Sequence, residues 1–423
     1  MTTLTRLANP WAVRRDRIQL YGCPEADDIA YKIRDFLGRT VVEFDWTPLE
    51  TDEQARDVDD RDDPRLPVCV LPNGDRLEAA TVASVARALG WIAEPRHETY
   101  DVCIYGAGPT GLSAAVYAAS EGLRTIMVER QAIGGQAGTS SKIENYLGFP
   151  GGISGAQLAE RARQQAIGFG AEILLLKASE GAFIRDGQLI GRFADGLEVN
   201  ARANICATGV EYRRLNLPDE DRLLNRGIYY GAGNSEAPLC RDQDVYVVGG
   251  GNSAGQAAMN FARHARKVTI LIRGAGLAAS MSQYLVDRIE QHKRIEIRTC
   301  CQIVGIEGRD HLSAVTLRDN RTGDETRAET RHVFAMLGGK PNTAWAQELG
   351  IACDDAGYLL TGQDAAAEGW PLGRSPYELE TSWPGLFAAG DVRHGSVKRV
   401  ASAVGEGAMA ITQIHRYLAE VAG

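Results

Sequence analysis

Residues 100–130 read YDVCIYGAGPTGLSAAVYAASEGLRTIMVER. An apolar run leads into the glycine pattern Gly106-x-Gly108-x-x-Gly111, and a second apolar run ends at Glu129. This order predicts a strand, a tight turn, a helix and a second strand, which together open a dinucleotide-binding fold. The N-terminus of the helix offers N–H groups and a partial positive charge to a pyrophosphate. An acid at the end of the second strand accepts ribose hydroxyls, and we expect Glu129 to do so.

A second stretch of the same kind covers residues 244–274, DVYVVGGGNSAGQAAMNFARHARKVTILIRG. Its pattern, Gly249-x-Gly251-x-x-Ala254, again follows an apolar run, but the next apolar run ends at Arg273 instead of an acid. A guanidinium at this position suits the 2′-phosphate of NADPH, so the sequence favours NADPH over NADH. A surface arginine without a role in binding is the alternative.

Two such loops predict an α/β fold with two Rossmann-like dinucleotide-binding domains, the second inserted in the first. A chain of 423 residues has room for a further small domain. The segment before the first loop, residues 1–95, contains no nucleotide loop and is expected to form that domain.

The composition disfavours several classes of function. The chain has 46 Lys and Arg against 55 Asp and Glu, whereas a protein that coats nucleic acid needs a basic face. No apolar run approaches the ~18–20 residues of a membrane helix, and no signal peptide is visible. The seven histidines show no ligand spacing, so no metal site is expected. The eight cysteines show neither C-x-x-C spacing nor the regular framework of a disulfide-bonded protein. We interpret them as reduced, mostly buried thiols of a cytoplasmic protein.

In residues 1–95 the expected order is strand, helix, strand, helical or loop segment, strand, turn, strand and helix. The segments that carry this order are 17–21, 25–37, 41–46, the acidic segment 50–63, 68–71, the turn at Asn73-Gly74, and 81–89. This order resembles the thioredoxin or glutaredoxin fold. Pro67 then occupies the position of that fold's cis-proline.

Residues 98–423 resemble the low-molecular-weight thioredoxin reductases in four segments, which occur in the order of that family. They are Gly134-Gly135-Gln136 with Ile143-Glu144-Asn145, Ala207-Thr208-Gly209, Gly385–Val392, and Lys398–Ala401. In the family, the first segment cradles the flavin ring and the second leads from the FAD domain into the NADPH domain. The third supplies Asp391 to the ribityl chain, and the fourth opens the last helix toward the flavin pyrimidine.

The resemblance implies an FAD-binding domain of residues 98–212 and 333–423, an NAD(P)H-binding domain of residues 213–332, and a homodimer. The residues expected to bind FAD are Gly106, Gly108, Pro109, Gly111, Glu129, Gly135, Gln136, Asn145, Ala207, Thr208, Gly209, Gly390, Asp391, Arg399 and Val400. Those expected to bind NADPH, or NADH as the less favoured cofactor, are Gly249, Gly251, Asn252, Ser253, Ala254 and Arg273. No catalytic side chain is expected, because the flavin carries the chemistry.

The paired cysteines of the family are missing from this sequence. The C-x-x-C pair that relays electrons to a disulfide would fall around residues 231–235, which read GAGNS. The two catalytic cysteines of a glutaredoxin would fall at Ala26 and Ile29. Cys23 is out of register and Cys240 lies beyond the aligned pair, so we interpret both as structural thiols. The N-terminal domain is then a docking or dimer-contact domain.

The leading hypothesis is an FAD-dependent oxidoreductase that takes hydride from NAD(P)H and passes electrons directly to a small-molecule or redox-protein acceptor. Cysteine-free relatives that reduce ferredoxin show that this scaffold works without a dithiol. One alternative is a disulfide reductase that uses unconventional thiols such as Cys23 or Cys240. Another is a non-catalytic flavoprotein that senses redox state or binds a partner. No nucleic-acid or membrane partner is expected.

Overall fold

The computed structural model describes residues 17–23, 28–59, 65–92, 94–140, 142–185, 187–224, 226–230, 237–278, 280–309 and 311–421. The chain divides into two units, Met1–Leu89 and Gly90–Gly423. Within the described residues, no helix is long and apolar enough to cross a membrane.

The described part of the first unit is a four-stranded sheet with helices. Its elements are β1 (Ile18–Gly22), α1 (Asp28–Arg39), β2 (Phe44–Pro48), α2 (Asp52–Asp59), β3 (Val68–Val70), β4 (Arg76–Leu77) and α3 (Val82–Ala88). The strands lie in the order β2-β1-β3-β4, with β1 parallel to β2 and antiparallel to β3. The elements follow the predicted order, and the peptide bond between Leu66 and Pro67 is cis.

The ends of α1 differ from the sequence prediction. The predicted start at Glu25 lies outside the described residues. The helix continues through Gly38, where the sequence predicted its end, to Arg39. The hydroxyl of Thr40 donates to the carbonyl of Phe36 at 2.7 Å. The backbone N–H of Thr40 also donates to this carbonyl, at 3.0 Å, so the last turn of the helix runs past the glycine.

The second unit contains the sheet that carries the first glycine-rich loop. Its elements before the inserted part are β5 (Tyr100–Tyr105), α4 (Pro109–Ser120), β6 (Thr125–Val128), η1 (Ala137–Thr139), α5 (Gly155–Gly168), β7 (Glu172–Leu174), β8 (Ser179–Arg185), β9 (Gln188–Phe193) and β10 (Glu198–Cys206). Those after it are α9 (Ala344–Glu348), α10 (Gly362–Ala367), β21 (Leu386–Ala388), η3 (Gly390–Val392) and α11 (Val400–Val421).

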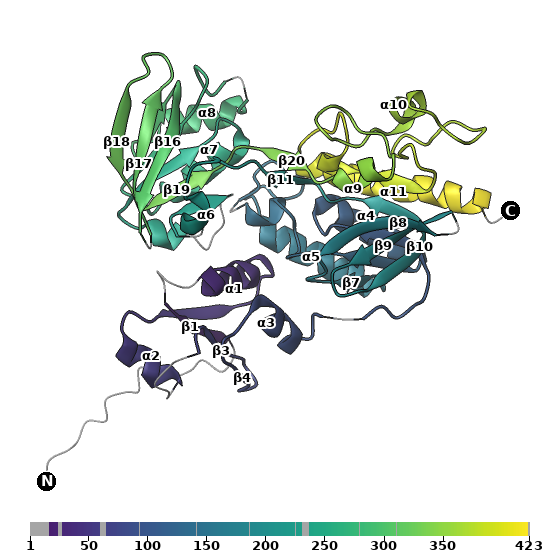
Figure 1. The fold of residues 1–423 in the computed structure, drawn as a ribbon, viewed down its shortest axis with the longest axis horizontal. Helices are drawn as coiled ribbons and strands as arrows, with labels where there is room; N and C mark the ends of the chain where they lie inside the picture. The colour runs from purple at the N-terminus through teal and green to yellow at the C-terminus, as the bar shows by residue number, and fades with distance from the viewer. Residues whose placement is uncertain are drawn as a thin grey trace, which may run out of the picture. The chain divides into compact units, whose positions relative to one another are not determined.

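The strands of this sheet lie in the order β7-β6-β5-β10-β9-β8, and β21 pairs with β10. The strands β5, β6, β7, β10 and β21 are parallel, whereas β9 is antiparallel to its neighbours. Helix α11 packs on α4, although the two are far apart in the sequence (Figure 1). Their contact is part of an apolar core that includes Ile104, Leu112, Phe387 and Ile411.

The inserted part carries the second loop. Its elements are α6 (Glu220–Leu223), β12 (Ile228–Tyr230), η2 (Ala237–Cys240), β13 (Asp244–Val248), α7 (Asn252–Phe261), β14 (Lys267–Leu271), α8 (Gln283–Glu290), β15 (Ile295–Arg298), β16 (Cys301–Gly308), β17 (Leu312–Asp319), β18 (Glu325–Glu329) and β19 (His332–Ala335). A parallel sheet has the order β12-β19-β13-β14-β15, and β16, β17 and β18 form a separate antiparallel sheet (Figure 1).

A two-stranded ribbon joins the two parts of the second unit. It consists of β11 (Val210–Tyr212), on the way into the inserted part, and β20 (Gly339–Pro341), on the way out. A side chain at Gly339 would place its Cβ 2.2 Å from a methyl carbon of Val210, so the close pairing of the ribbon requires glycine there. The insertion of the second dinucleotide part into the first is thus the topology that the sequence predicted.

Candidate functional site

The carboxyl ends of four parallel strands meet at one edge of the first sheet. Tyr105 of β5 is in register with Val128 of β6 and with Cys206 of β10, and Cys206 is in register with Ala388 of β21. The residues that follow these strand ends therefore gather at this edge, and they are Gly106, Glu129, Ala207 and Ala389. Ligands of open α/β sheets bind at such an edge.

The turn after β5 depends on two of the predicted glycines. Gly106 has a φ of 105°, and a Cβ there would lie 2.5 Å from the carbonyl oxygen of Ala207. A Cβ at Gly111 would lie 1.8 Å from the carbonyl oxygen of Gly106. Gly111 lies inside α4, because the helix begins at Pro109. Proline suits the first helical position, since its φ is preset and its missing N–H is not needed there.

The N-terminus of α4 lies open toward a ligand. Its N-cap residue is Gly108, and no side chain caps the helix. The backbone of Gly108 faces that of Gly135, and a Cβ built on Gly135 would reach the Cα of Gly108 at 3.0 Å. The two loops are also joined by the N–H of Gly134, which donates to the carbonyl of Ala107 at 2.7 Å. Bare backbone and uncapped N–H groups are what a pyrophosphate requires.

Backbone N–H groups of the turn hold the side chain of Glu129 in place. One carboxylate oxygen accepts the N–H of Ala107 at 2.9 Å, and the other accepts the N–H of Gln131 at 2.8 Å. The side chain is buried. Each oxygen retains lone pairs for the hydroxyls of a ribose. The donor set at this edge therefore fits the adenosine and pyrophosphate of FAD.

Asp391 lies in η3 at the same edge. Burial raises the pKa of its carboxyl group, the charge of Glu406 adds to this, and Lys398 opposes it. Within the part of the chain that the structure describes, no donor reaches the carboxylate of Asp391. Its neighbour Gly390 donates its N–H to Glu406 at 2.6 Å, and Glu406 also accepts two hydrogen bonds from Arg393. Sequence reasoning missed this supporting role of Glu406.

The remaining residues predicted for FAD lie around the same loops. The side-chain amide of Gln136 donates to the carbonyl of Val210 at the start of the ribbon. Thr208 and Asn145 are exposed, Gly209 is half-buried, and α11 begins at Val400, directly after Arg399. Helix α11 is bound to α4 through Ser113, whose hydroxyl donates to the carbonyl of Val404 at 2.7 Å.

The second loop lies at the equivalent edge of the second parallel sheet. Val248 is in register with Leu271 and with Ala335, so Gly249 and the segment leading to Arg273 lie together. Gly251 is the N-cap of α7, and again no side chain caps the helix. The loop residues Ser253 and Ala254 form the first turn of that helix.

The side chain of Asn252 is used inside the protein. Its amide oxygen accepts both the N–H of Ser282, at 2.8 Å, and the hydroxyl of Ser282, at 2.9 Å. The hydroxyl of Ser280 donates to the carbonyl of Gly250 at 2.8 Å. The segment before α8 is thus bound to the second loop, which the sequence pattern did not indicate. Arg273 is exposed, two residues beyond the end of β14.

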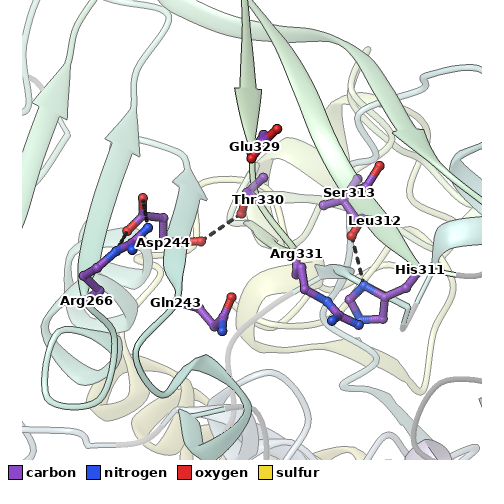
Figure 2. Close-up of a pocket in the computed structure, with 9 residues that line it drawn as sticks. All are labelled: Gln243, Asp244, Arg266, His311, Leu312, Ser313, Glu329, Thr330 and Arg331. Atoms are coloured by element: carbon purple, nitrogen blue, oxygen red, sulfur yellow. Dashed lines mark hydrogen bonds and ion pairs between the residues drawn. The ribbon is translucent and has the colours of Figure 1, made fainter.

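One cavity of about 400 Å³ lies at the opposite edge of this sheet (Figure 2). It is lined by Gln243, Asp244, Arg266, His311, Leu312, Ser313, Glu329, Thr330 and Arg331. Arg266 forms two hydrogen bonds to the carboxylate of Asp244, both at 2.9 Å, and Thr330 donates to the backbone carbonyl of Asp244 at 2.8 Å. Asp244 is the first residue of β13, so the cavity is remote from the loop that follows this strand.

All eight cysteines lie in the described residues, and no disulfide joins them. Five of them are buried, namely Cys69, Cys103, Cys206, Cys240 and Cys301. Burial raises the pKa of the thiols of Cys69 and Cys103 to about 12. Residues 231–235 and Ala26, the predicted positions of the missing cysteines, lie outside the described residues. No group of histidine, cysteine or acidic side chains in the described ranges has the geometry of a metal site.

The chain matches the family model described as pyridine nucleotide-disulphide oxidoreductase over residues 100–407. It belongs to this family. It is 34% identical over 328 residues to the bifunctional thioredoxin reductase/thioredoxin of Mycobacterium leprae, which covers 77% of this chain and 68% of the relative. It is 33% identical over 321 residues to the thioredoxin reductase of Mycolicibacterium smegmatis, with 76% and 97% covered.

Solved structures give the same result for this member of the pyridine nucleotide-disulphide oxidoreductases. Lactococcus lactis thioredoxin reductase in its FR conformation superposes with a TM-score of 0.68 at 29% identity, covering 76% of this chain and 99% of that one. Thioredoxin reductase of T. acidophilum gives 0.67 at 28% identity, with 77% and 100% covered. The two predicted Rossmann-like domains and a thioredoxin reductase-like, NAD(P)H-dependent flavoprotein enzyme are therefore confirmed. The family implies FAD and NADPH as cofactors.

Proposed function

We propose that this enzyme takes hydride from NADPH and passes electrons from FAD directly to an acceptor, without a redox dithiol. When bound, FAD would accept the hydride and pass its electrons on. The protein chain would position the cofactor and place charged groups and helix N-termini around it. The N-terminus of α4 would hold the pyrophosphate, Glu129 would bind the adenosine ribose, and Asp391 would bind the ribityl chain. The N-terminus of α11 would offer a partial positive charge to the negative charge that develops on flavin reduction.

The observation that carries the direct route is the placement of the cysteines. The sequence contains no C-x-x-C pair, and residues 231–235 carry no sulfur. Dithiol relay requires a reactive thiolate. Cys240, which follows those residues, is buried in η2, and burial raises the pKa of the Cys353 thiol to about 11. These thiols have the environment of packing residues. The acceptor is then a small molecule such as a quinone, oxygen, or a redox protein.

The names of the relatives support a second candidate function. The relatives carry the name thioredoxin reductase, so reduction of a disulfide through Cys23 or Cys240 is the second candidate. A protein that binds flavin without turnover is a third. Thiol dependence separates the first two, and NADPH oxidation with generic acceptors separates the first from the third.

For the second cofactor we propose NADPH in preference to NADH, on the basis of Arg273. The exposed guanidinium of Arg273, two residues beyond β14, is available to a 2′-phosphate. Bidentate hydrogen bonds between a guanidinium and a phosphate are strong. The other arginines that surround this phosphate in the family are absent, since residues 274–278 read GAGLA.

We further propose that the first unit is a thioredoxin/glutaredoxin-like domain that docks a partner or stabilises a homodimer. The strand order β2-β1-β3-β4, with β1 parallel to β2 and antiparallel to β3, supports the assignment. Ala26 and Ile29 at the catalytic positions support a non-catalytic role. A cytoplasmic location completes the proposal. Light scattering of the full chain and of a chain without residues 1–89 would test the homodimer.

Anaerobic reduction of the purified protein, followed by absorbance, tests the proposed reaction. NADPH should bleach the flavin band faster than NADH at equal concentration. A protein that binds FAD but is bleached by neither nucleotide would contradict the enzyme assignment.

A further inference from the structure

An ion pair connects the two parts of the second unit away from the ribbon. The guanidinium of Arg288, in the last turn of α8, lies 2.8 Å from one carboxylate oxygen of Glu144. The other carboxylate oxygen lies 3.0 Å from the ammonium of Lys142. Burial alone would raise the pKa of Glu144, but the hydrogen bond from Lys142 and the charge of Arg288 bring it below its ordinary value. The pair is therefore charged at neutral pH.

On one side, the pair is tied to the second glycine-rich loop. The segment before α8 is bound to that loop through Asn252 and Ser282. The helix itself packs on α7, where a Cβ at Gly255 would lie 2.6 Å from a methyl carbon of Leu285. These contacts join α8 to the loop, so a shift of the loop would also shift Arg288.

On the other side, the pair is tied to the first loop. Residues 143 and 153 exchange two backbone hydrogen bonds, at 2.7 and 3.1 Å, which fix the segment that carries Glu144. The N–H of Gly155, at the start of α5, donates to the carbonyl of Ser140 at 2.9 Å. A Cβ at Gly134 would lie 2.9 Å from the Cβ of Ala159, so α5 also packs on the loop that faces the N-terminus of α4.

We propose that Glu144 and Arg288 are positioning residues for hydride transfer, holding the nucleotide loop in register with the flavin loop. The inference rests on the proposed function for the placement of the two cofactors. Hydride transfer needs the reacting atoms about 3–3.5 Å apart, and the β11–β20 ribbon is otherwise a narrow connection between the two parts. An exposed ion pair adds little stability, so its loss should change the rate of transfer more than the melting temperature.

The test compares Glu144→Gln, Arg288→Gln, the double variant and Arg288→Lys in stopped-flow reduction by saturating NADPH without oxygen. Each Gln variant should reduce its flavin about two- to fivefold more slowly, the double variant should be no slower than the single ones, and Arg288→Lys should restore most of the rate. The KM for NADPH should not change. High salt should slow the wild type and leave Arg288→Gln unaffected.

Hydrogen exchange provides a readout that does not depend on turnover. The amides of β11 and β20 should exchange faster in both Gln variants. Arg318→Gln is the matched control, because Arg318 pairs with Glu325 at 2.6 Å within the β17–β18 hairpin and should change neither rate nor exchange. Wild-type rate and wild-type exchange in Glu144→Gln and Arg288→Gln would overturn the positioning role alone. A wild-type protein that holds FAD but is not reduced by NADPH would overturn the proposed function instead.

Discussion

The carboxylate of Glu129, directly after β6, accepts the backbone N–H of Ala107 at 2.9 Å, and Ala107 lies between the first two glycines of the turn. The same carboxylate accepts the N–H of Gln131 at 2.8 Å. The acid that the sequence pattern assigned to a ribose therefore also fixes the loop that would bind the pyrophosphate. Removal of this buried carboxylate should therefore both weaken the loop and remove a ligand of the ribose.

Glu129→Gln should lower both stability and FAD content. The amide keeps one acceptor oxygen but turns its NH₂ toward a backbone N–H, so one charge-assisted hydrogen bond is lost. A bond of this kind contributes about 1.5–3 kcal/mol. Thermal unfolding and the ratio of flavin to protein absorbance would measure the two effects. Glu198→Gln, which breaks an exposed pair with Arg185, is the control and should leave both quantities unchanged.

Gly108→Ala and Gly111→Ala should fail in different ways. A Cβ at Gly108 meets only the Cα of Gly135 at 4.0 Å, and the φ of −73° suits alanine. Gly108→Ala should therefore fold normally and lose FAD, because the methyl group occupies the approach to the pyrophosphate. A Cβ at Gly111 would lie 1.8 Å from the carbonyl oxygen of Gly106, so Gly111→Ala should not fold stably. Full FAD content in Gly108→Ala would show that the loop binds something else.

The sequence predicted the two loops well because their chemistry is local. Glycine spacing, the flanking apolar runs and the residue that ends the second strand all lie within about 30 residues, the length of one βαβ unit. It did not predict the contacts that assemble the site from distant segments. Glu406 of α11 accepts the N–H of Gly390, and the side-chain oxygen of Asn252 accepts the N–H of Ser282. No spacing in the sequence indicates either hydrogen bond.

Arg374 has a structural role that the sequence did not indicate. Arg374 donates to both carboxylate oxygens of Glu380, at 2.7 and 3.0 Å, and Glu380 is fully buried. This hydrogen bond raises the pKa of Arg374 above its ordinary value. The position could not be read from the sequence, because Glu380 has no motif to identify it as buried.

Arg374→Met should destabilise the protein by about 3–5 kcal/mol, because among the described residues only the N–H groups of Tyr377 and Gly385 would then donate to the buried carboxylate of Glu380. Urea unfolding would measure the difference. Arg318→Met, which breaks an exposed pair, should cost less than about 1 kcal/mol. Equal effects of the two substitutions would mean that the Arg374–Glu380 pair is not a buried ion pair in solution.

Arg273→Ala should raise the KM for NADPH and leave that for NADH nearly unchanged. Loss of one charge-assisted phosphate contact corresponds to about 1.5–3 kcal/mol, or roughly ten- to a hundredfold in affinity. Steady-state rates with both nucleotides would measure this. Arg241→Ala is the control, because Arg241 precedes β13 at the edge of the sheet remote from the loop. Equal changes for NADPH and NADH would exclude Arg273 as the residue that selects between them.

The last prediction concerns the missing dithiol. A reductase with a flavin and a redox-active cysteine pair takes up four electrons per chain, whereas this protein should take up only the two of its flavin. Anaerobic titration with dithionite should therefore bleach the flavin completely after about one two-electron equivalent per FAD, as expected of a flavin without a redox partner. Cys23→Ser and Cys240→Ser should change neither this endpoint nor the rate of NADPH oxidation. Because Cys240 is buried, its variant must first be shown to unfold at the wild-type temperature. A second equivalent that disappears in either variant would establish disulfide chemistry and reject direct transfer from the flavin.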